Sequence, residues 1–261
     1  MGGIVTAREL RRLLGKDHKI IMIDKSPVHS FGGSLVWVML GWRKPGSIQK
    51  PLSSLSKFGI DIYYETVTSI SPENNLIRTG ERSFQYDYLV VALGAEYALS
   101  GIPGLAEVSD TFYTIDGAYR LFRSIQAFKG GNIAICVSAL PYKCPPAPYE
   151  GGLLLESYLS RKGIKEFEIT IFTPESSPLA VTGPPVSKMI AGILHDRNIR
   201  FTGGMKLSSI EPSKSILHFD NGETHRFDLC ITVPPHRPTA VVRNCGLTGN
   251  EGWIDVNPRT L

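Results

Sequence analysis

Long apolar runs are missing from this 261-residue sequence. No stretch reaches the roughly 18–20 consecutive apolar residues that a membrane-spanning helix needs, so none is expected. The first segment, "MGGIVTARELRRLLGK", is interrupted by charged residues between Arg8 and Arg12. A secretory signal peptide requires an uninterrupted apolar core, so this segment is not expected to be one.

An excess of one charge and a high cysteine content are also missing. The 28 basic and 24 acidic residues leave a net charge of +4, which is too small to favour nucleic-acid binding. The four cysteines, at positions 136, 144, 230 and 245, have no metal-ligand spacing and are too few for a disulfide scaffold. The sequence therefore predicts no metal site and a reducing compartment.

Alternating strand and helix patterns are present instead. Apolar runs of strand length occur in "KIIMIDK", "YLVVALG", "NIAICVS", "FEITIFTPE" and "FDLCITVP", and helical patterns occur in "TARELRRLLG", "LLLESYLSRKG" and "PPVSKMIAGILHDRN". This order predicts an α/β architecture with a largely parallel sheet. Two strand–loop–helix units of the same kind predict two Rossmann-like dinucleotide-binding domains in tandem. The expected division is 1–104, 105–237 and a return to the first domain at 238–261.

The N-terminal segment carries part of a dinucleotide-binding pattern. Gly2 and Gly3 open a helix, and Asp24 ends the next strand roughly 20 positions later, which is the usual distance to a ribose-binding acid. A helix N-terminus also favours a pyrophosphate. The preceding strand and the first glycines of the pattern are absent, so a plain helix start and a surface acid remain an alternative.

The segment "YKCPPAPYEGG", residues 142–152, replaces the usual phosphate-binding glycines with prolines and a cysteine. Proline removes a backbone donor, which argues against a dinucleotide at this turn. Lys143 and the start of the following helix would favour the thiolate of Cys144. Gly151 and Gly152 would let that helix approach the sheet closely. We predict a redox thiol at Cys144, and a small buried side chain in a rigid turn is the alternative.

The order of several segments carries a resemblance to a known family. The segments are "GGIVTARELRR", "IDKSP", "WVMLGWRKP", "YDYLVVALGAEY", "KCPPAPYE" and "NPRTL". Over nearly the whole chain they resemble FAD-dependent pyridine nucleotide-disulfide oxidoreductases of the sulfide:quinone oxidoreductase and flavocytochrome c sulfide dehydrogenase branch. The resemblance implies oxidation of sulfide, or of a similar small sulfur compound, on Cys144 and a second redox cysteine beyond residue 261. Electrons would pass through a cysteine–flavin adduct to FADH2 and then to a membrane quinone.

The resemblance also implies site residues and a location. Glu150 would move protons near Cys144, although an ordinary acid in a first helical turn is the alternative. The expected FAD-binding positions are Gly2, Gly3, Asp24 and Lys25 for the adenosine and pyrophosphate side, Val67 for adenine, and Ala92 and Gly94 beside the cofactor. A peripheral protein on the cytoplasmic side of a bacterial or archaeal membrane is expected, with a homo-oligomer as a further option.

Two departures from the family pattern leave alternatives open. The chain opens inside the glycine turn and stops before a Gly-Asp segment and a region of membrane-facing helices, so we expect a fold truncated at both termini. The acceptor could instead be a cytochrome c partner. The chain could be an alternative NADH dehydrogenase, against which the missing second glycine turn counts, or an inactive flavoprotein fold.

The remaining candidate residues carry weaker signals. Cys136 and Cys230 lie inside apolar strands and are expected in the core, whereas Cys245 lies in a loop and could be exposed. Trp37 and Trp42 flank an apolar segment and could cover a flavin or simply pack. His236 lies in a loop near the expected domain boundary and is a minor candidate.

Overall fold

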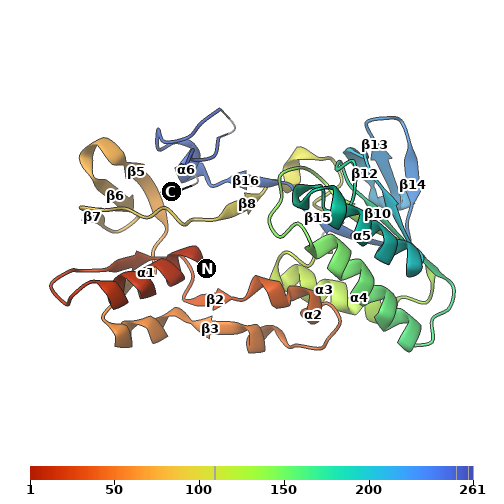
Figure 1. Ribbon diagram of the computed structural model, residues 1–261, viewed down its shortest axis with the longest axis horizontal. Helices are drawn as coiled ribbons and strands as arrows, with labels where there is room; N and C mark the ends of the chain where they lie inside the picture. Colours follow the sequence, from red (N-terminus) through yellow and green to blue (C-terminus); the bar gives the residue numbers. More distant parts are fainter. Residues whose placement is uncertain (109, 251, 258, 261) are drawn as a thin grey trace. The chain divides into compact units, whose positions relative to one another are not determined.

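The computed structural model describes residues 1–108, 110–250, 252–257 and 259–260, and the chain forms two compact units (Figure 1). Unit 1 contains residues 1–31, 49–96 and 237–261, and unit 2 contains residues 32–48 and 97–236. The expected boundaries at residues 104 and 237 compare with observed boundaries at 96 and 236, and residues 32–48 are a further difference. Residues 32–48 belong to unit 2, because Leu35, Val38 and Met39 pack into its hydrophobic core.

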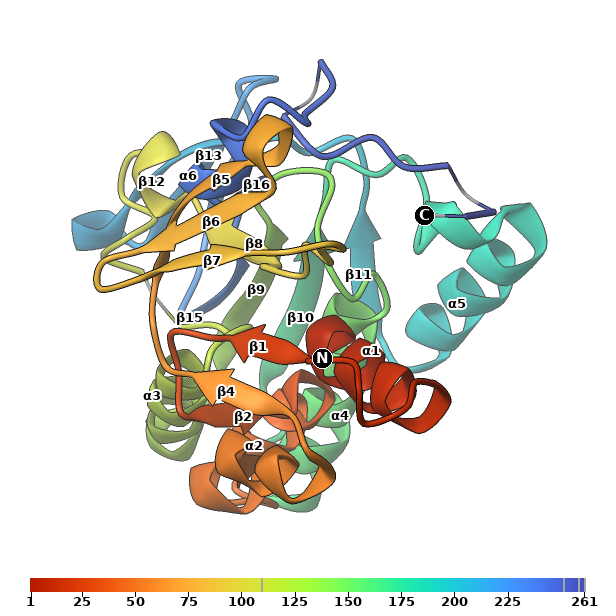
Figure 2. The ribbon, with the colours of Figure 1, turned by 90° about the vertical axis from the view of Figure 1, so that its left-hand side faces the viewer.

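Unit 2 is built on a four-stranded parallel sheet in the order β11–β10–β9–β15 (Figure 2). The strands are β9 (Gly131–Val137), β10 (Phe167–Phe172), β11 (Ile199–Thr202) and β15 (Leu229–Val233). Every residue of β15 and the last five of β9 are buried, as expected of parallel strands covered on both faces. The predicted parallel sheet and the predicted strands β9, β10 and β15 are confirmed.

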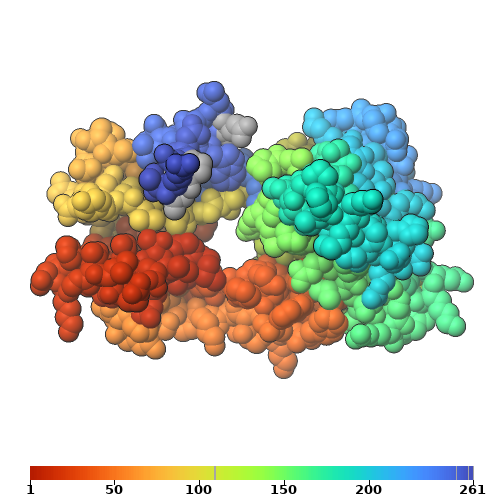
Figure 3. All heavy atoms as spheres, viewed as in Figure 1, coloured from red at the N-terminus to blue at the C-terminus, as the bar shows by residue number. Residues whose placement is uncertain are grey.

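The helices of unit 2 are α2 (Leu35–Val38), α3 (Ile115–Ala127), α4 (Ala147–Arg161) and α5 (Pro184–Asp196). Helix α4 follows β9 and α5 follows β10, whereas α2 and α3 precede these strands in the chain. The sequence patterns predicted α4 and α5 but not α3. The hydroxyl of Thr114 accepts the N–H of Gly117 at 3.0 Å and so caps the start of α3. Helix α5 lies at the surface of unit 2 (Figure 3), with Met189 and Ile193 exposed.

Unit 1 has a smaller core. Helix α1 (Gly2–Leu13) precedes β1 (Ile21–Ile23), which pairs in parallel with β4 (Asp61–Tyr63). A further pair, β2 (Val28–Ser30) and β3 (Gln49–Pro51), is antiparallel. The buried side chains of this core are Ala7, Ile20, Met22, Leu52, Leu55 and Ile60. The predicted first helix and the predicted strand that ends before Asp24 are confirmed.

Both units contain a three-stranded antiparallel sheet of the same design. In unit 1 it comprises β5 (Val67–Ser71), β6 (Leu76–Thr79) and β7 (Ser83–Gln85), and in unit 2 it comprises β12 (Leu207–Glu211), β13 (Ile216–Phe219) and β14 (Thr224–Arg226). Each first strand carries a register shift, and each first turn is a short 3-10 helix that ends in a left-handed residue, Asn75 or Ser215. The shared motif supports two tandem domains of one kind.

The remaining elements are short. Strands β8 (Ala95–Tyr97) and β16 (His236–Pro238) pair where the chain passes between the units, and α6 (Ala240–Arg243) follows β16. The 3-10 helices are Gly32–Ser34, Pro45–Ile48, Leu52–Phe58, Pro72–Asn74, Leu99–Gly101, Ala180–Thr182 and Pro212–Lys214. Across the described residues, no helix is both long enough and apolar enough to cross a membrane.

The predicted buried strand "YLVVALG", residues 88–94, is wrong. In unit 2 the segment after β14 is the buried strand β15, but the corresponding segment after β7 is not a strand. Tyr88 is 95% exposed and Val90 is 55% exposed. Among the described residues the parallel sheet of unit 1 consists of β1 and β4 alone, so the run has no strand to pair with and stays at the surface.

Candidate active site around Cys144

The cysteine-bearing loop lies at the carboxyl end of β9. The strand ends at Val137, the loop follows, and α4 begins at Ala147. Successive strands run from β9 toward β10 on one side, whereas β15 lies on the other side, so the strand order reverses at β9. In open α/β sheets, ligand sites form outside the carboxyl ends of the strands at such a reversal. The predicted strand–loop–helix arrangement is confirmed.

Cys144 occupies an unusual backbone conformation. Its φ is 57°, in the left-handed region that non-glycine residues rarely adopt and that costs about 1 kcal/mol or more. The carbonyl of Cys144 accepts the N–H of Ala147 at 2.9 Å. The hydroxyl of Tyr113 lies 3.0 Å from the carbonyl oxygen of Lys143 and 3.4 Å from that of Cys144. These bonds hold the loop in a single shape, with the Cys144 residue exposed.

The electrostatic surroundings do not favour the thiolate as predicted. Partial burial of the sulfur raises the pKa of Cys144, and the carboxylate of Glu150 raises it further. The N–H of Ala147 and the ammonium of Lys143 lower that pKa, but they are the smaller influences. Lys143 and the start of the helix therefore lower the pKa of Cys144 as predicted. The predicted overall lowering of that pKa is wrong, because it is raised.

The two glycines of α4 bring the helix onto the core, as predicted. A Cβ atom added at Gly151 would lie 3.0 Å from the ring of Phe112. A Cβ atom added at Gly152 would lie 3.3 Å from Ile135 and 3.4 Å from Ile171. These contacts are tighter than ordinary packing, so both positions let α4 lie close to its neighbours.

A buried carboxylate near the loop escaped sequence analysis. Oε2 of Glu175 accepts hydrogen bonds from the hydroxyls of Tyr142 (2.9 Å) and Tyr149 (2.7 Å), and lies 3.2 Å from the Thr173 hydroxyl. Glu175 follows β10, and the two tyrosines flank Cys144 in sequence. An acid directly after a buried strand, in "FTPE", was the available signal, but its partners are about 30 residues away.

The effect of Glu150 on the pKa of Cys144 can be tested directly. In Glu150→Gln a neutral amide replaces the carboxylate that raises the pKa of Cys144, so more thiolate is present at neutral pH. Alkylation of Cys144 by iodoacetamide at pH 7.5 should be roughly 2–5-fold faster, which corresponds to a pKa change of a few tenths of a unit. Lys143→Gln should slow it. Equal rates in both variants would show that neither charge acts on the thiol.

The other three cysteines are buried. Cys136 is fully buried, and burial raises its pKa to about 12. Burial also holds the pKa of Cys230 well above its usual value. The predicted core positions of Cys136 and Cys230 are confirmed. The expectation that Cys245 could be exposed is wrong, because its residue is buried and its sulfur lies 3.0 Å from the carbonyl oxygen of Val242. Cys144 is the exposed thiol of the four.

The tryptophan and histidine candidates take different positions. Trp37 lies in α2 against the core of unit 2, with the guanidinium of Arg43 4.2 Å from the centre of its ring. Trp42 is 49% exposed. His236 lies in β16 rather than in a loop, packs edge-on against Tyr97, and donates from Nδ1 to the carbonyl of Pro234 at 2.8 Å. Burial lowers the pKa of His236, which favours the neutral ring.

In unit 1, three of the predicted FAD-binding positions lie together. A Cβ atom added at Gly2 or Gly3 would lie 3.9 or 3.5 Å from the Cβ atom of Ala92, which is ordinary contact. Protein packing therefore does not require glycine at either position, as expected where a glycine faces a ligand. The first helical bond runs from the N–H of Val5 to the carbonyl of Met1. The preceding N–H groups of α1 have no acceptor within the helix, which suits a phosphate.

The other predicted cofactor positions occupy strand ends and turns. Asp24 follows β1, where its N–H donates to the carbonyl of Tyr63 at 3.0 Å and its Oδ1 accepts the N–H of Ser26 at 2.9 Å. Lys25 is exposed, Val67 begins β5, and Gly94 has a φ of 71°. An ordered carboxylate at a strand end suits a ribose hydroxyl. The residues of unit 1 thus fit the adenosine diphosphate part of FAD, and the individual contacts stay predictions.

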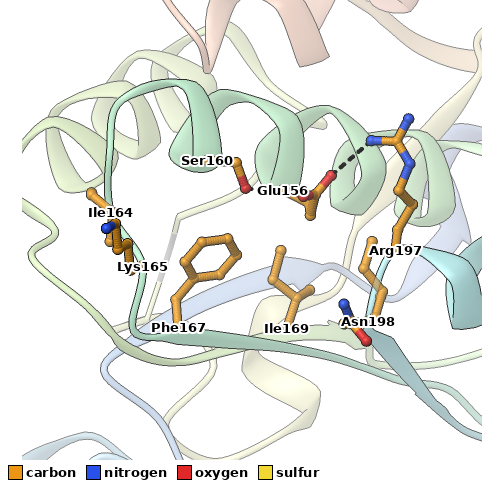
Figure 4. Close-up of a pocket in the computed structure, with 9 residues that line it drawn as sticks. Glu156, Ser160, Ile164, Lys165, Phe167, Ile169, Arg197 and Asn198 are labelled. Atoms are coloured by element: carbon orange, nitrogen blue, oxygen red, sulfur yellow. Dashed lines mark hydrogen bonds and ion pairs between the residues drawn. The ribbon is translucent and has the colours of Figure 1, made fainter.

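A pocket of about 320 Å³ lies elsewhere in unit 2 (Figure 4). It is lined by Phe167 and Ile199, the first residues of β10 and β11, and by Glu156 of α4, which pairs with Arg197 at 3.1 Å. It therefore lies at the amino ends of the strands, opposite the Cys144 edge. Within the described residues, no cluster of histidine, cysteine, aspartate or glutamate could hold a metal ion.

Comparisons with known proteins agree with this arrangement. The family model for pyridine nucleotide-disulphide oxidoreductases matches residues 1–260. The chain is 31% identical to the sulfide-quinone reductase of Aquifex aeolicus, over 94% of this chain and 59% of that protein. It is 24% identical to the mitochondrial sulfide:quinone oxidoreductase of Mus musculus, over 100% and 60%. The X-ray structure of the Aquifex aeolicus sulfide:quinone oxidoreductase superimposes with a TM-score of 0.86 and 29% identity, over 98% and 61%.

The chain belongs to the pyridine nucleotide-disulphide oxidoreductase family. This confirms the predicted family and α/β fold, and FAD is the cofactor of this class of oxidoreductase. Among the relatives, the chain resembles the sulfide:quinone oxidoreductases. It spans about 60% of the length of those relatives.

Proposed function

We propose that this chain acts in the oxidation of sulfide, or of a similar small sulfur compound, with a quinone as electron acceptor. The observation that carries the proposal is the exposed thiol of Cys144 on a proline-bearing loop, where related dinucleotide-binding folds have glycines. The similarity to sulfide:quinone oxidoreductases supports the substrate and the acceptor. Association with the membrane surface, where quinones reside, belongs to the same proposal.

The proposed reaction transfers two electrons from hydrosulfide to a quinone. Hydrosulfide loses two electrons and a proton to become zero-valent sulfur, and a quinone takes up two electrons and two protons to become a quinol. Sulfur chemistry on a protein requires a nucleophilic sulfur that solvent can reach. Among the four cysteines, only Cys144 is exposed, and the other three are buried.

The loop residues have distinct roles in the proposal. The sulfur of Cys144 forms an S–S bond with the sulfur of hydrosulfide to give a persulfide; the protons of both sulfurs leave, and the two electrons released would pass to FAD when it is bound. The ammonium of Lys143 and the N–H of Ala147 favour the thiolate that starts this step. Glu150, exposed in the first turn of α4, takes the proton that the thiol releases. Because burial and Glu150 raise the pKa of Cys144, the proposal predicts turnover that rises with pH as the thiol ionises.

FAD fits the proposal through unit 1. When bound, it supplies a two-electron acceptor between the sulfur compound and the quinone. Gly2 and Gly3, with the N–H groups at the start of α1, would bind its pyrophosphate, and Asp24 would accept from its ribose. Val67, Ala92 and Gly94 would lie along the rest of the cofactor.

The proposal is tested by sulfide-dependent quinone reduction. Anaerobic mixing with sulfide should bleach the flavin absorbance of the purified, FAD-loaded protein, and a soluble ubiquinone analogue should restore it. Restoration by cytochrome c but not by the quinone would move the assignment to a sulfide dehydrogenase that uses a cytochrome. No bleaching by sulfide would refute the proposal.

A second prediction concerns NADH. Pro145, Pro146 and Pro148 occupy the turn where backbone N–H groups would bind the NADH pyrophosphate, and proline has no N–H to donate. Stopped-flow mixing with NADH should therefore reduce the flavin at least about 100-fold more slowly than sulfide does, as expected from losing several charge-assisted bonds. Fast reduction by NADH with none by sulfide would assign the protein to the NADH dehydrogenases of this family.

A further inference from the structure

We infer that Glu175 is a positioning residue for Cys144, holding the loop that presents the thiol from both of its ends. The inference rests on the role proposed for Cys144. Tyr142 lies two residues before the cysteine, and Tyr149 lies five residues after it in the first turn of α4. Both side chains reach the same oxygen of Glu175, Oε2, at 2.9 and 2.7 Å.

The hydrogen-bond donors and acceptors of this cluster match. Burial raises the pKa of both Tyr142 and Tyr149, so each phenol keeps its proton and can donate it to the carboxylate. The hydroxyl of Tyr142 also lies 3.1 Å from the carbonyl oxygen of Pro145, directly after the cysteine. The hydroxyl has one proton, which these two oxygens share, so Tyr142 lies between Glu175 and the main chain directly after Cys144.

Glu175 is itself fixed by the main chain of the sheet edge. Its N–H donates to the hydroxyl of Thr173 at 3.2 Å, and its carbonyl accepts the N–H of Gly204 at 2.9 Å. Gly203 permits this close approach of the two backbones, because a Cβ atom there would lie 2.6 Å from the carbonyl oxygen of Glu175. Glu175 therefore holds the loop in a fixed position relative to β10 and β11.

The arrangement explains how Cys144 stays in its left-handed conformation. Glu175, Tyr142 and Tyr149 are each less than 9% exposed, so the hydrogen bonds among them are not exchanged for bonds to water. With the loop fixed at both ends, Cys144 stays at φ 57° and its thiol keeps its partly buried position. A strained residue persists only where its surroundings determine it in this way.

The test is the reactivity of the Cys144 thiol, which needs neither sulfide nor FAD. We expect Glu175→Leu to speed alkylation of Cys144 by iodoacetamide at pH 8 about tenfold, because a loosened loop exposes the sulfur and removes the burial that raises its pKa. Glu175→Gln keeps one acceptor oxygen and should speed it about threefold. Tyr142→Phe, which preserves the packing of the ring, should speed it by a similar factor. Peptide mass spectrometry identifies the alkylated cysteine.

A matched control separates positioning from stability. Glu156 lies in α4 and, like Glu175, is largely buried and paired, but it lies at the opposite edge of the sheet. Glu156→Gln should lower the melting temperature while leaving the alkylation rate of Cys144 unchanged. An unchanged or slower rate in folded Glu175→Leu and Tyr142→Phe would overturn the inference. If the rates rise as expected but sulfide does not bleach the flavin, the positioning role stands and the proposed function fails.

Discussion

Replacing Cys144 with serine is expected to abolish sulfide-dependent quinone reduction while FAD remains bound. A serine hydroxyl is nearly isosteric with the thiol but barely ionises near neutral pH, whereas the thiol supplies a nucleophilic sulfur. Because Cys144 is exposed, the substitution leaves the core intact and should change the melting temperature by only about 1–2 °C. Flavin content per chain and sulfide-dependent bleaching are measured on the same preparation.

Cys136→Ser is the matched control for this prediction. Cys136 lies within β9 and is fully buried, so its replacement puts a hydroxyl into an apolar core at a cost of about 1–3 kcal/mol if that hydroxyl finds no partner. The variant should lose stability and retain normal turnover per folded molecule. Near-normal sulfide turnover by Cys144→Ser, or loss of turnover in folded Cys136→Ser, would contradict the assignment of the redox thiol.

Local sequence patterns predicted the parts of the fold that depend on residues close together in the sequence. The strands β9, β10 and β15 are continuous apolar runs, which a parallel sheet buries on both faces. The loop of Cys144 was found because prolines and a cysteine stand where a phosphate-binding turn has glycines. The close packing of α4 followed from Gly151 and Gly152.

Features that depend on distant partners could not be predicted. The run at 88–94 has the composition of β15, yet it lies exposed, because a strand needs a neighbour and sequence composition does not supply one. Helix α3 is a different case, because its apolar spacing and its Thr114 cap are local signals, yet the sequence patterns did not predict it. The side chain of Glu175 acquires its role only through two tyrosines brought to it by the packing of α4 on the sheet.

The pKa of Cys144 could not be predicted from the sequence either, because it depends on burial of the sulfur in the folded protein. Neighbours in sequence indicated a stabilised thiolate, and both Lys143 and the N–H of Ala147 do act in that direction. Burial of the sulfur and the carboxylate of Glu150 outweigh them. Because the thiol is largely protonated near neutral pH, the reaction proposed here needs a proton acceptor beside the loop, and Glu150 is the exposed carboxylate that acts on the thiol.

Gly152→Leu is expected to destabilise unit 2 by about 2–3 kcal/mol, lowering its melting temperature by several degrees. The first added carbon would already lie 3.3 Å from Ile135 and 3.4 Å from Ile171, and both of these side chains are fully buried. Leucine would improve the helix propensity by about 1 kcal/mol, but the remaining carbons have no free volume to enter. Helix α4 would therefore have to move away from the sheet.

Gly192→Leu is the matched control, because it makes the same substitution at a helix position with free space around it. Gly192 lies in α5, is exposed, and has no atom within 4 Å of an added Cβ atom. Its replacement gains the helix propensity without a clash, so a stabilisation of about 0.5–1 kcal/mol is expected. Thermal or urea unfolding of both variants gives the comparison. If Gly152→Leu were as stable as Gly192→Leu, the close approach of α4 to β9 and β10 would be wrong, and with it the position of the Cys144 loop at the start of that helix.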